Sequence, residues 1–124
     1  MTFSIIALLT GIACAGLGLG FLLTPAGMLR PWGLTADPGS SLLSRRIGAV
    51  YLGLALLLVL GRAAPPSELR TAVSACFGLS TALLAGLGLF ELRAGTASRG
   101  ILLSVAVEIA MALSFGALVV GGSP

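Results

Sequence analysis

Four long apolar stretches divide the chain, and each is long enough to cross a bilayer as a helix. They cover Phe3–Leu23, Leu42–Gly61, Leu69–Leu92 and Ile101–Gly121. A helix rises about 1.5 Å per residue, so about 20 apolar residues span a hydrocarbon core. The second and third connections are short, which makes consecutive helices antiparallel neighbours. The pattern predicts an all-α polytopic membrane protein, a single domain over 1–124 built as an antiparallel bundle of four transmembrane helices.

The first connection, residues 24–41, is the longest and differs from the others in composition. It carries three prolines, Pro25, Pro31 and Pro38. Proline interrupts a continuous helix, and tryptophan, here Trp32, prefers the level of the lipid headgroups. We therefore expect this segment to lie along the membrane interface, with one short helical turn near residues 25–30.

Small residues and caps predict further details of the helices. Gly16 and Gly20 form a GxxxG pair, a spacing that lets a neighbouring helix approach closely. Ser67, just before the third helix, is suited to cap its first turn. In the same helix a second row of small residues recurs at every fourth position and predicts a face for close packing: Ser74, Gly78, Ala82 and Gly86.

Composition supports the membrane assignment and narrows the chemistry. Charged residues make up 9% of the chain, whereas soluble domains carry about 25%, so a water-soluble surface could not be covered. The seven basic residues are all arginines and form no continuous basic stripe, which argues against nucleic-acid binding. Histidine is absent, and with it the commonest metal ligand and general base. We expect no enzyme activity, no metal and no cofactor.

Two cysteines, Cys14 and Cys76, both lie within apolar stretches. Counting along the helices places them about 14 Å and about 24 Å from the same membrane face. Bridged cysteines need Cα atoms within about 7 Å. We therefore expect two free thiols that are buried as small apolar side chains.

The arginines are distributed unequally between the two membrane sides. Five of them flank the first and third connections: Arg30, Arg45, Arg46, Arg93 and Arg99. Arg62 and Arg70 flank the second connection on the other side. Because arginines accumulate on the cytoplasmic side, this distribution predicts that both termini lie outside.

Glu108 is the residue that does not fit its surroundings, since it falls near the middle of the fourth apolar stretch. A carboxylate at the centre of a bilayer costs about 3 kcal/mol on insertion scales. Such a residue is usually paired, protonated or directed into a wet cavity. Glu108 is therefore the starting point for any functional site.

Depth counting brings further polar residues toward Glu108. Tyr51 on the second helix lies at the same estimated depth of about 13–14 Å, and Thr81 on the third is close to it. Arg45 is shallower, but its side chain can extend along the helix, and Ser104 shares a face with Glu108. We expect a buried polar cluster in which Glu108 hydrogen-bonds Tyr51 first and Arg45 second. This cluster either binds a ligand or moves protons, or it has only the structural role of fixing the helix register.

The stretch FLLTPAGMLRPWGL, followed by SRRIGAVYLGLALLLVLGR, resembles small bacterial four-helix membrane proteins of the DoxX-like group and their uncharacterised relatives. The shared features are an apolar first helix that ends before a proline, a Gly-rich loop, and an Arg-Gly-aromatic start of the second helix. The resemblance covers the first half of the chain. It implies a compact four-helix bundle in the bacterial inner membrane, and it supplies no activity and no catalytic residues.

Two functions from different classes remain open. The first is a non-enzymatic integral membrane protein, either an accessory subunit of a membrane-protein partner or a binder of a small lipophilic ligand. The second is an oligomeric proton-coupled transporter of small molecules that uses Glu108. A membrane enzyme is the least favoured reading, because the chain offers so few catalytic side chains.

Overall fold

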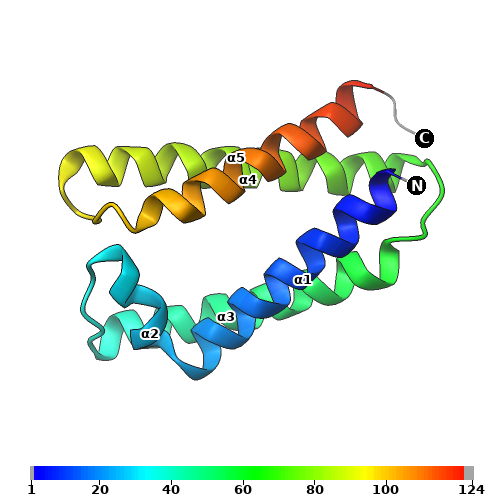
Figure 1. Ribbon diagram of the computed structural model, residues 1–124. Helices are drawn as coiled ribbons and strands as arrows, with labels where there is room; N and C mark the ends of the chain where they lie inside the picture. Colours follow the sequence, from blue (N-terminus) through cyan, green and yellow to red (C-terminus); the bar gives the residue numbers. More distant parts are fainter. Residues whose placement is uncertain (1, 122–124) are drawn as a thin grey trace. The chain divides into compact units, whose positions relative to one another are not determined.

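The computed structural model describes residues 2–121, and these residues form long helices joined by short connections (Figure 1). The elements are α1 (Thr2–Leu23), α2 (Pro25–Leu29), the 3-10 helix η1 (Arg30–Trp32), α3 (Pro38–Gly61), α4 (Glu68–Ala94) and α5 (Ile101–Val120). Four of them, α1, α3, α4 and α5, are long and apolar enough to cross a membrane. The predicted all-α class and the four predicted spans are confirmed.

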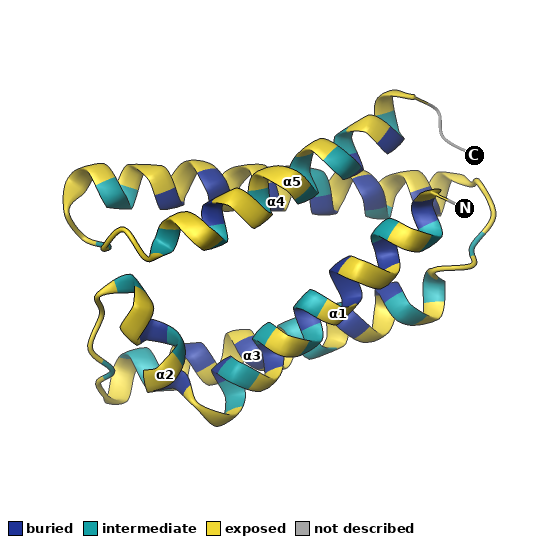
Figure 2. Cartoon of the chain, in the orientation of Figure 1, coloured by how far each residue is buried: buried dark blue, intermediate teal, exposed yellow. Residues whose placement is uncertain are grey.

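Each long helix buries one side and exposes the other, as the dark blue and yellow residues show (Figure 2). The exposed sides carry large apolar residues such as Leu60, Leu103 and Val120. In water these side chains would form an unfavourable surface, but in a bilayer lipid tails cover them. The chain is therefore a multi-pass membrane protein in contact with lipid.

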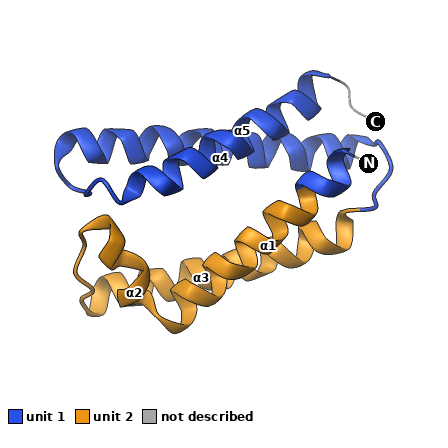
Figure 3. Cartoon of the chain, viewed as in Figure 1, with its two compact units in different colours: residues 1–6, 63–124 blue, residues 7–62 orange. Residues whose placement is uncertain are grey.

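The chain divides into two compact units (Figure 3). Unit 2 comprises residues 7–62 and contains most of α1 together with α2, η1 and α3. Unit 1 comprises residues 1–6 and 63–124 and contains the start of α1 together with α4 and α5. Each unit holds one antiparallel pair of long helices. The single four-helix domain over 1–124 stays a prediction.

In unit 2 the backbones of α1 and α3 meet at Gly18 and Gly48. A Cβ atom on Gly48 would lie 2.7 Å from the Gly18 carbonyl oxygen and 2.8 Å from the Leu22 nitrogen. A Cβ atom on Gly18 would lie 2.9 Å from the Gly48 carbonyl oxygen. Gly16, in contrast, is exposed and has no such neighbour within 4 Å. The close approach predicted at Gly16 is therefore wrong and occurs at Gly18.

The segment after α1 folds back against the end of that helix. The Met28 side chain packs over Gly20, where an added Cβ would lie 2.5 Å from the Met28 sulfur. The Trp32 ring lies 6.2 Å from the ring of Phe21, centroid to centroid. Gly33 then ends η1 in the left-handed conformation with a φ of 78°. The predicted helical turn near residues 25–30 is confirmed and continues to Trp32.

Helix α3 begins at Pro38, four residues earlier than the predicted start at Leu42. Asp37 and Ser40 form a capping box at this point. The Asp37 Oδ1 accepts a hydrogen bond from the Ser40 N–H at 2.7 Å, and the Ser40 Oγ accepts one from the Asp37 N–H at 2.9 Å. Proline suits the first helical position because it has no N–H to satisfy there. Pro38 thus starts the helix that it was expected to exclude.

This cap predicts a pH dependence at the start of α3. The backbone hydrogen bond from Ser40 lowers the pKa of the Asp37 carboxyl below its ordinary value. The contribution of the charged cap is therefore complete above about pH 3.9, the unfolded pKa, and is lost as the pH falls through the lower folded pKa. Amide exchange at Ser40 should accelerate over that acidic range beyond the intrinsic pH effect. Asp37→Asn should keep the cap and remove this excess, and an excess retained in the Asn variant would contradict the assignment.

In unit 1 helices α4 and α5 pack along one stripe of each helix. The rings of Phe77 and Phe115 stack with centroids 5.4 Å apart. The buried positions of α4 are spaced by three or four residues: Arg70, Ser74, Phe77, Thr81, Ala85 and Gly88. Of the small-residue row predicted at every fourth position, Ala82 and Gly86 are exposed. Steps of four advance about 40° around a helix, so that row winds away from the contact.

Two smaller sequence predictions are also decided. The Ser67 Oγ accepts a hydrogen bond from the Arg70 N–H at 3.2 Å, so Ser67 caps α4 as expected. Both cysteines are free, as expected, and Cys14 is buried. Cys76, on α4, is exposed, which makes its predicted burial wrong.

Candidate functional site

Glu108 lies on the stripe of α5 that faces α4. It is three residues after Val105 and seven before Phe115, and both of these side chains are buried against α4. Seven residues are close to two full helical turns, so Glu108 and Phe115 point in nearly the same direction. Glu108 itself is half-buried. The full burial that was predicted for its carboxyl is not seen.

The packing of α4 against α5 sets the level of Glu108 along α4. A Cβ on Gly88 would lie 2.6 Å from the Val105 side chain, and one on Gly78 would lie 3.6 Å from Phe115. The antiparallel register between these two contacts brings Glu108 level with Ala85. Ala85 is buried and presents only a methyl group, so it offers the carboxyl no hydrogen-bond donor. Thr81 lies one turn farther along α4.

Two of the predicted site residues, Thr81 and Ser104, lie in the same unit as Glu108. Thr81 is buried, and its hydroxyl donates to the carbonyl oxygen of Phe77 at 2.7 Å within α4. This bond satisfies the hydroxyl inside its own helix. Ser104 is half-buried one turn before Glu108. Among the described residues of this unit, none forms a hydrogen bond or ion pair with Glu108.

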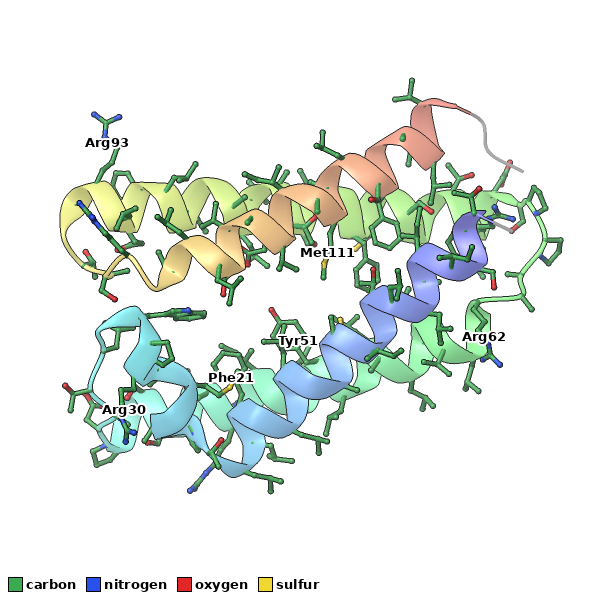
Figure 4. All side chains as sticks on the ribbon, in the orientation of Figure 1. Phe21, Arg30, Tyr51, Arg62, Arg93 and Met111 are labelled. Atoms are coloured by element: carbon green, nitrogen blue, oxygen red, sulfur yellow. The ribbon has the colours of Figure 1, made fainter. Side chains whose placement is uncertain are left out.

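The other two predicted site residues, Tyr51 and Arg45, lie on α3 in unit 2, and Figure 4 labels Tyr51. The Tyr51 ring stacks on Phe21 with centroids 6.2 Å apart and planes 10° from parallel. Tyr51 is half-buried, whereas Arg45 is exposed. Gly48, one turn farther along the same face of α3, is buried, whereas the Arg45 side chain is not. A bond from Glu108 to either residue stays a prediction.

Arg70 is a buried charged residue that sequence reasoning assigned only to the membrane surface. Its side chain is 8% exposed, and its guanidinium lies 4.4 Å from the centre of the Phe3 ring. Its Nη1 donates to the carbonyl oxygen of Ala64 at 3.2 Å. Arg70 therefore ties the start of α1 and the second connection to α4. No local signal reveals this, because Phe3 is far from Arg70 in the sequence.

A groove of about 510 Å³ runs beside this arginine in unit 1, with Glu68, Arg70 and Ser74 on its α4 side and Leu118 of α5 opposite. The Ser74 hydroxyl donates to the Arg70 carbonyl oxygen at 3.0 Å. The contacts of Arg70 with Ala64 and Phe3 hold the first turn of α4 in place. Its role is therefore structural.

Neither a metal site within residues 2–121 nor a known relative helps to assign a role to these residues. Within residues 2–121, no three His, Cys, Asp or Glu side chains gather closely enough to hold a metal ion. Comparisons with protein-family models, with curated proteins and with solved structures found no match. The DoxX-like resemblance therefore has no support from them. The half-buried carboxyl of Glu108 in the middle of a span is the feature from which a function can be inferred.

Proposed function

We propose that this multi-pass membrane protein is not an enzyme and binds a small lipophilic ligand through Glu108. The observation that carries the proposal is the position of this carboxyl. It lies within the span of α5, on the side facing α4, without a hydrogen-bond partner among the described residues of its unit. A carboxylate in that environment gains from any ligand that supplies a positive charge or a strong donor.

The surroundings define the chemical class of this ligand. The side chains nearest along the helices, Ala85, Val105 and Phe115, are all apolar and buried. An apolar molecule with one cationic or donor group suits such surroundings, because its apolar part contacts apolar side chains and its polar group meets the carboxyl. Ser104, one turn away, is the second proposed contact. Thr81, on α4, completes the part of the proposed cluster that lies in this unit.

Membrane orientation belongs to the same proposal. We propose the bacterial inner membrane, with both termini outside. The support is the arginine distribution, because five of the seven arginines flank the connections 24–37 and 95–100, which share one side of a four-span chain.

Binding of a lipophilic cation by the full chain in phosphatidylcholine nanodiscs tests the role of Glu108. The probe is the tetraphenylphosphonium ion, measured by equilibrium dialysis beside the uncharged triphenylphosphine. Glu108→Gln should weaken binding of the cation by about tenfold or more, because a charge-assisted contact is lost. Binding of the uncharged probe should change little. Equal binding of the cation by the parent and the Gln variant would exclude Glu108 as the contact.

Glu91→Gln is the matched control, since Glu91 is also half-buried but lies at the end of α4 rather than at its middle. It should bind both probes like the parent. Uptake of the cation driven by a pH gradient in proteoliposomes, abolished by Glu108→Gln, would instead support the proton-coupled transporter. Parent protein that binds neither probe would leave the accessory-subunit role as the better reading.

A further inference from the structure

The connection from α1 to α3 is a folded segment at the membrane surface. It joins two spans, so residues 24–37 must lie at one face of the bilayer. Met28 packs over Gly20, and Trp32 packs against Phe21, so α2 and η1 are held against the end of α1. A tryptophan in such a place lies at the level of the headgroups.

A groove of about 250 Å³ opens in this segment. It is lined by Ala26, Arg30, Leu34, Thr35 and Ala36. Arg30 brings a guanidinium with several N–H donors, and Thr35 brings a hydroxyl. The remaining lining is apolar. This combination suits a molecule that has an anionic group next to hydrocarbon.

Arg45 and Arg46 on α3 lie at the same depth as this segment. Gly11 packs against the α3 residues near Val59, and Gly18 packs against Gly48. Continuing this antiparallel register at about 1.5 Å per residue brings the last residue of α1, Leu23, level with Arg45. Both arginines are exposed. They therefore lie on the surface of unit 2, level with the point where α1 leaves the hydrocarbon.

The charge at this end of unit 2 is strongly positive. Residues 7–62 contain one acid, Asp37, to offset the charges of Arg30, Arg45 and Arg46. The Asp37 carboxylate is already occupied in the cap of α3. It therefore offsets the arginines only in part. A cationic surface with an amphipathic groove remains at headgroup depth.

We propose that Arg30, Arg45 and Arg46, with the groove beside Arg30, form a binding site for the phosphate of an anionic phospholipid. The guanidinium groups bind the phosphate oxygens, because planar N–H pairs match the geometry of a phosphate. Leu34 and the neighbouring alanines contact the upper part of the acyl chains. This site is separate from Glu108 and does not depend on the ligand proposed there.

Trp32 provides a direct readout, because it is the only tryptophan of the chain and lies two residues from Arg30. The full chain is reconstituted in phosphatidylcholine vesicles that contain a small, equal fraction of brominated phosphatidylglycerol or brominated phosphatidylcholine. Bromine quenches a nearby tryptophan. The brominated anionic lipid should quench Trp32 clearly more strongly, and added salt should reduce the difference.

Variants connect this preference to the arginines. Arg30→Gln and the double variant Arg45→Gln, Arg46→Gln should each lower the apparent affinity for phosphatidylglycerol, by about fivefold per arginine removed. Arg62→Gln is the matched control. Arg62 is also an exposed arginine of unit 2, but it lies at the opposite end of α3 from Arg30 (Figure 4). Its Nη1 donates to the Val59 carbonyl oxygen. It should keep the full preference.

Three outcomes would overturn the proposal. They are equal quenching by both lipids, an equal loss in the Arg62 variant, and an unchanged preference in both the Arg30 and the Arg45–Arg46 variants. Millimolar inorganic phosphate that abolishes the preference would show that the site takes free phosphate instead. Far-UV circular dichroism of each variant checks its helix content. If the double variant is unfolded, Arg30→Gln and the salt dependence of the parent decide the question.

Discussion

Gly48→Ala should destabilise the α1–α3 pair by about 2 kcal/mol or more, although it adds only one methyl group. The new Cβ would lie 2.7 Å from the Gly18 carbonyl oxygen and 2.8 Å from the Leu22 nitrogen. Both are backbone atoms of α1, so no side-chain rotation relieves the overlap, and the two helices must separate. Separation removes the close packing that holds helices together in lipid, where the hydrophobic effect between them is absent.

The measurement is unfolding of the protein in mixed micelles as sodium dodecyl sulfate is added, followed by circular dichroism. Gly53→Ala is the matched control, because Gly53 lies on the same helix and a Cβ there meets nothing within 4 Å. That variant should be as stable as the parent or gain up to about 1 kcal/mol from better helix propensity. Equal stability of the two alanine variants would show that α1 and α3 do not meet at Gly48.

A double variant sharpens this test. Gly18→Ala places its Cβ 2.9 Å from the Gly48 carbonyl oxygen and should also destabilise the pair. Once one methyl group has separated the helices, the second should cost less. The double variant should therefore lose less free energy of unfolding than the two single variants lose together, as expected for residues in direct contact.

Phe115→Ala should destabilise the α4–α5 pair by about 2–3 kcal/mol. Phe115 is fully buried and stacks on Phe77 at 5.4 Å between ring centroids. Its removal leaves a cavity between the helices and ends the ring contact, which contributes about 0.5–1.5 kcal/mol. The transfer contribution known from soluble proteins is small here, because lipid is as apolar as the helix contact.

The same titration with sodium dodecyl sulfate measures this loss. Leu113→Ala is the control on α5, since Leu113 is 70% exposed and faces lipid. It should change the free energy of unfolding by less than about 0.5 kcal/mol. If Phe115→Ala and Leu113→Ala have the same free energy of unfolding, the α4–α5 contact does not involve Phe115.

Much of the fold was predictable from the sequence, because the controlling signals are local. A run of about 20 apolar residues can satisfy its backbone in lipid only as a helix, so the four spans follow from their lengths. Ser67 caps α4 because a hydroxyl at that position accepts from the next turn. Asp37 and Ser40 carry a similar local signal for α3. Pro38 obscures this signal, because a proline can either end a helix or occupy its first turn.

The contacts between helices could not be read in this way, because they depend on how two helices meet. Both Gly16 and Gly18 are small, yet only Gly18 lies opposite Gly48. Ala82 and Gly86 continue a row with a step of four along α4, but the buried positions of α4 mix steps of three and four residues instead. A spacing along one helix does not specify which of its faces meets a partner.

The candidate site shows the same division. The sequence alone identified Glu108, since a carboxyl within an apolar span stands out in any arrangement. Three further features became visible only once the helices were packed. They are the half-burial of Glu108 beside Ala85, the use of the Thr81 hydroxyl within α4 and the exposure of Arg45. The burial of Arg70 over Phe3 joins residues 67 positions apart. Depth counting gives the level of a residue in the membrane, but its direction around the helix axis depends on which helices surround it.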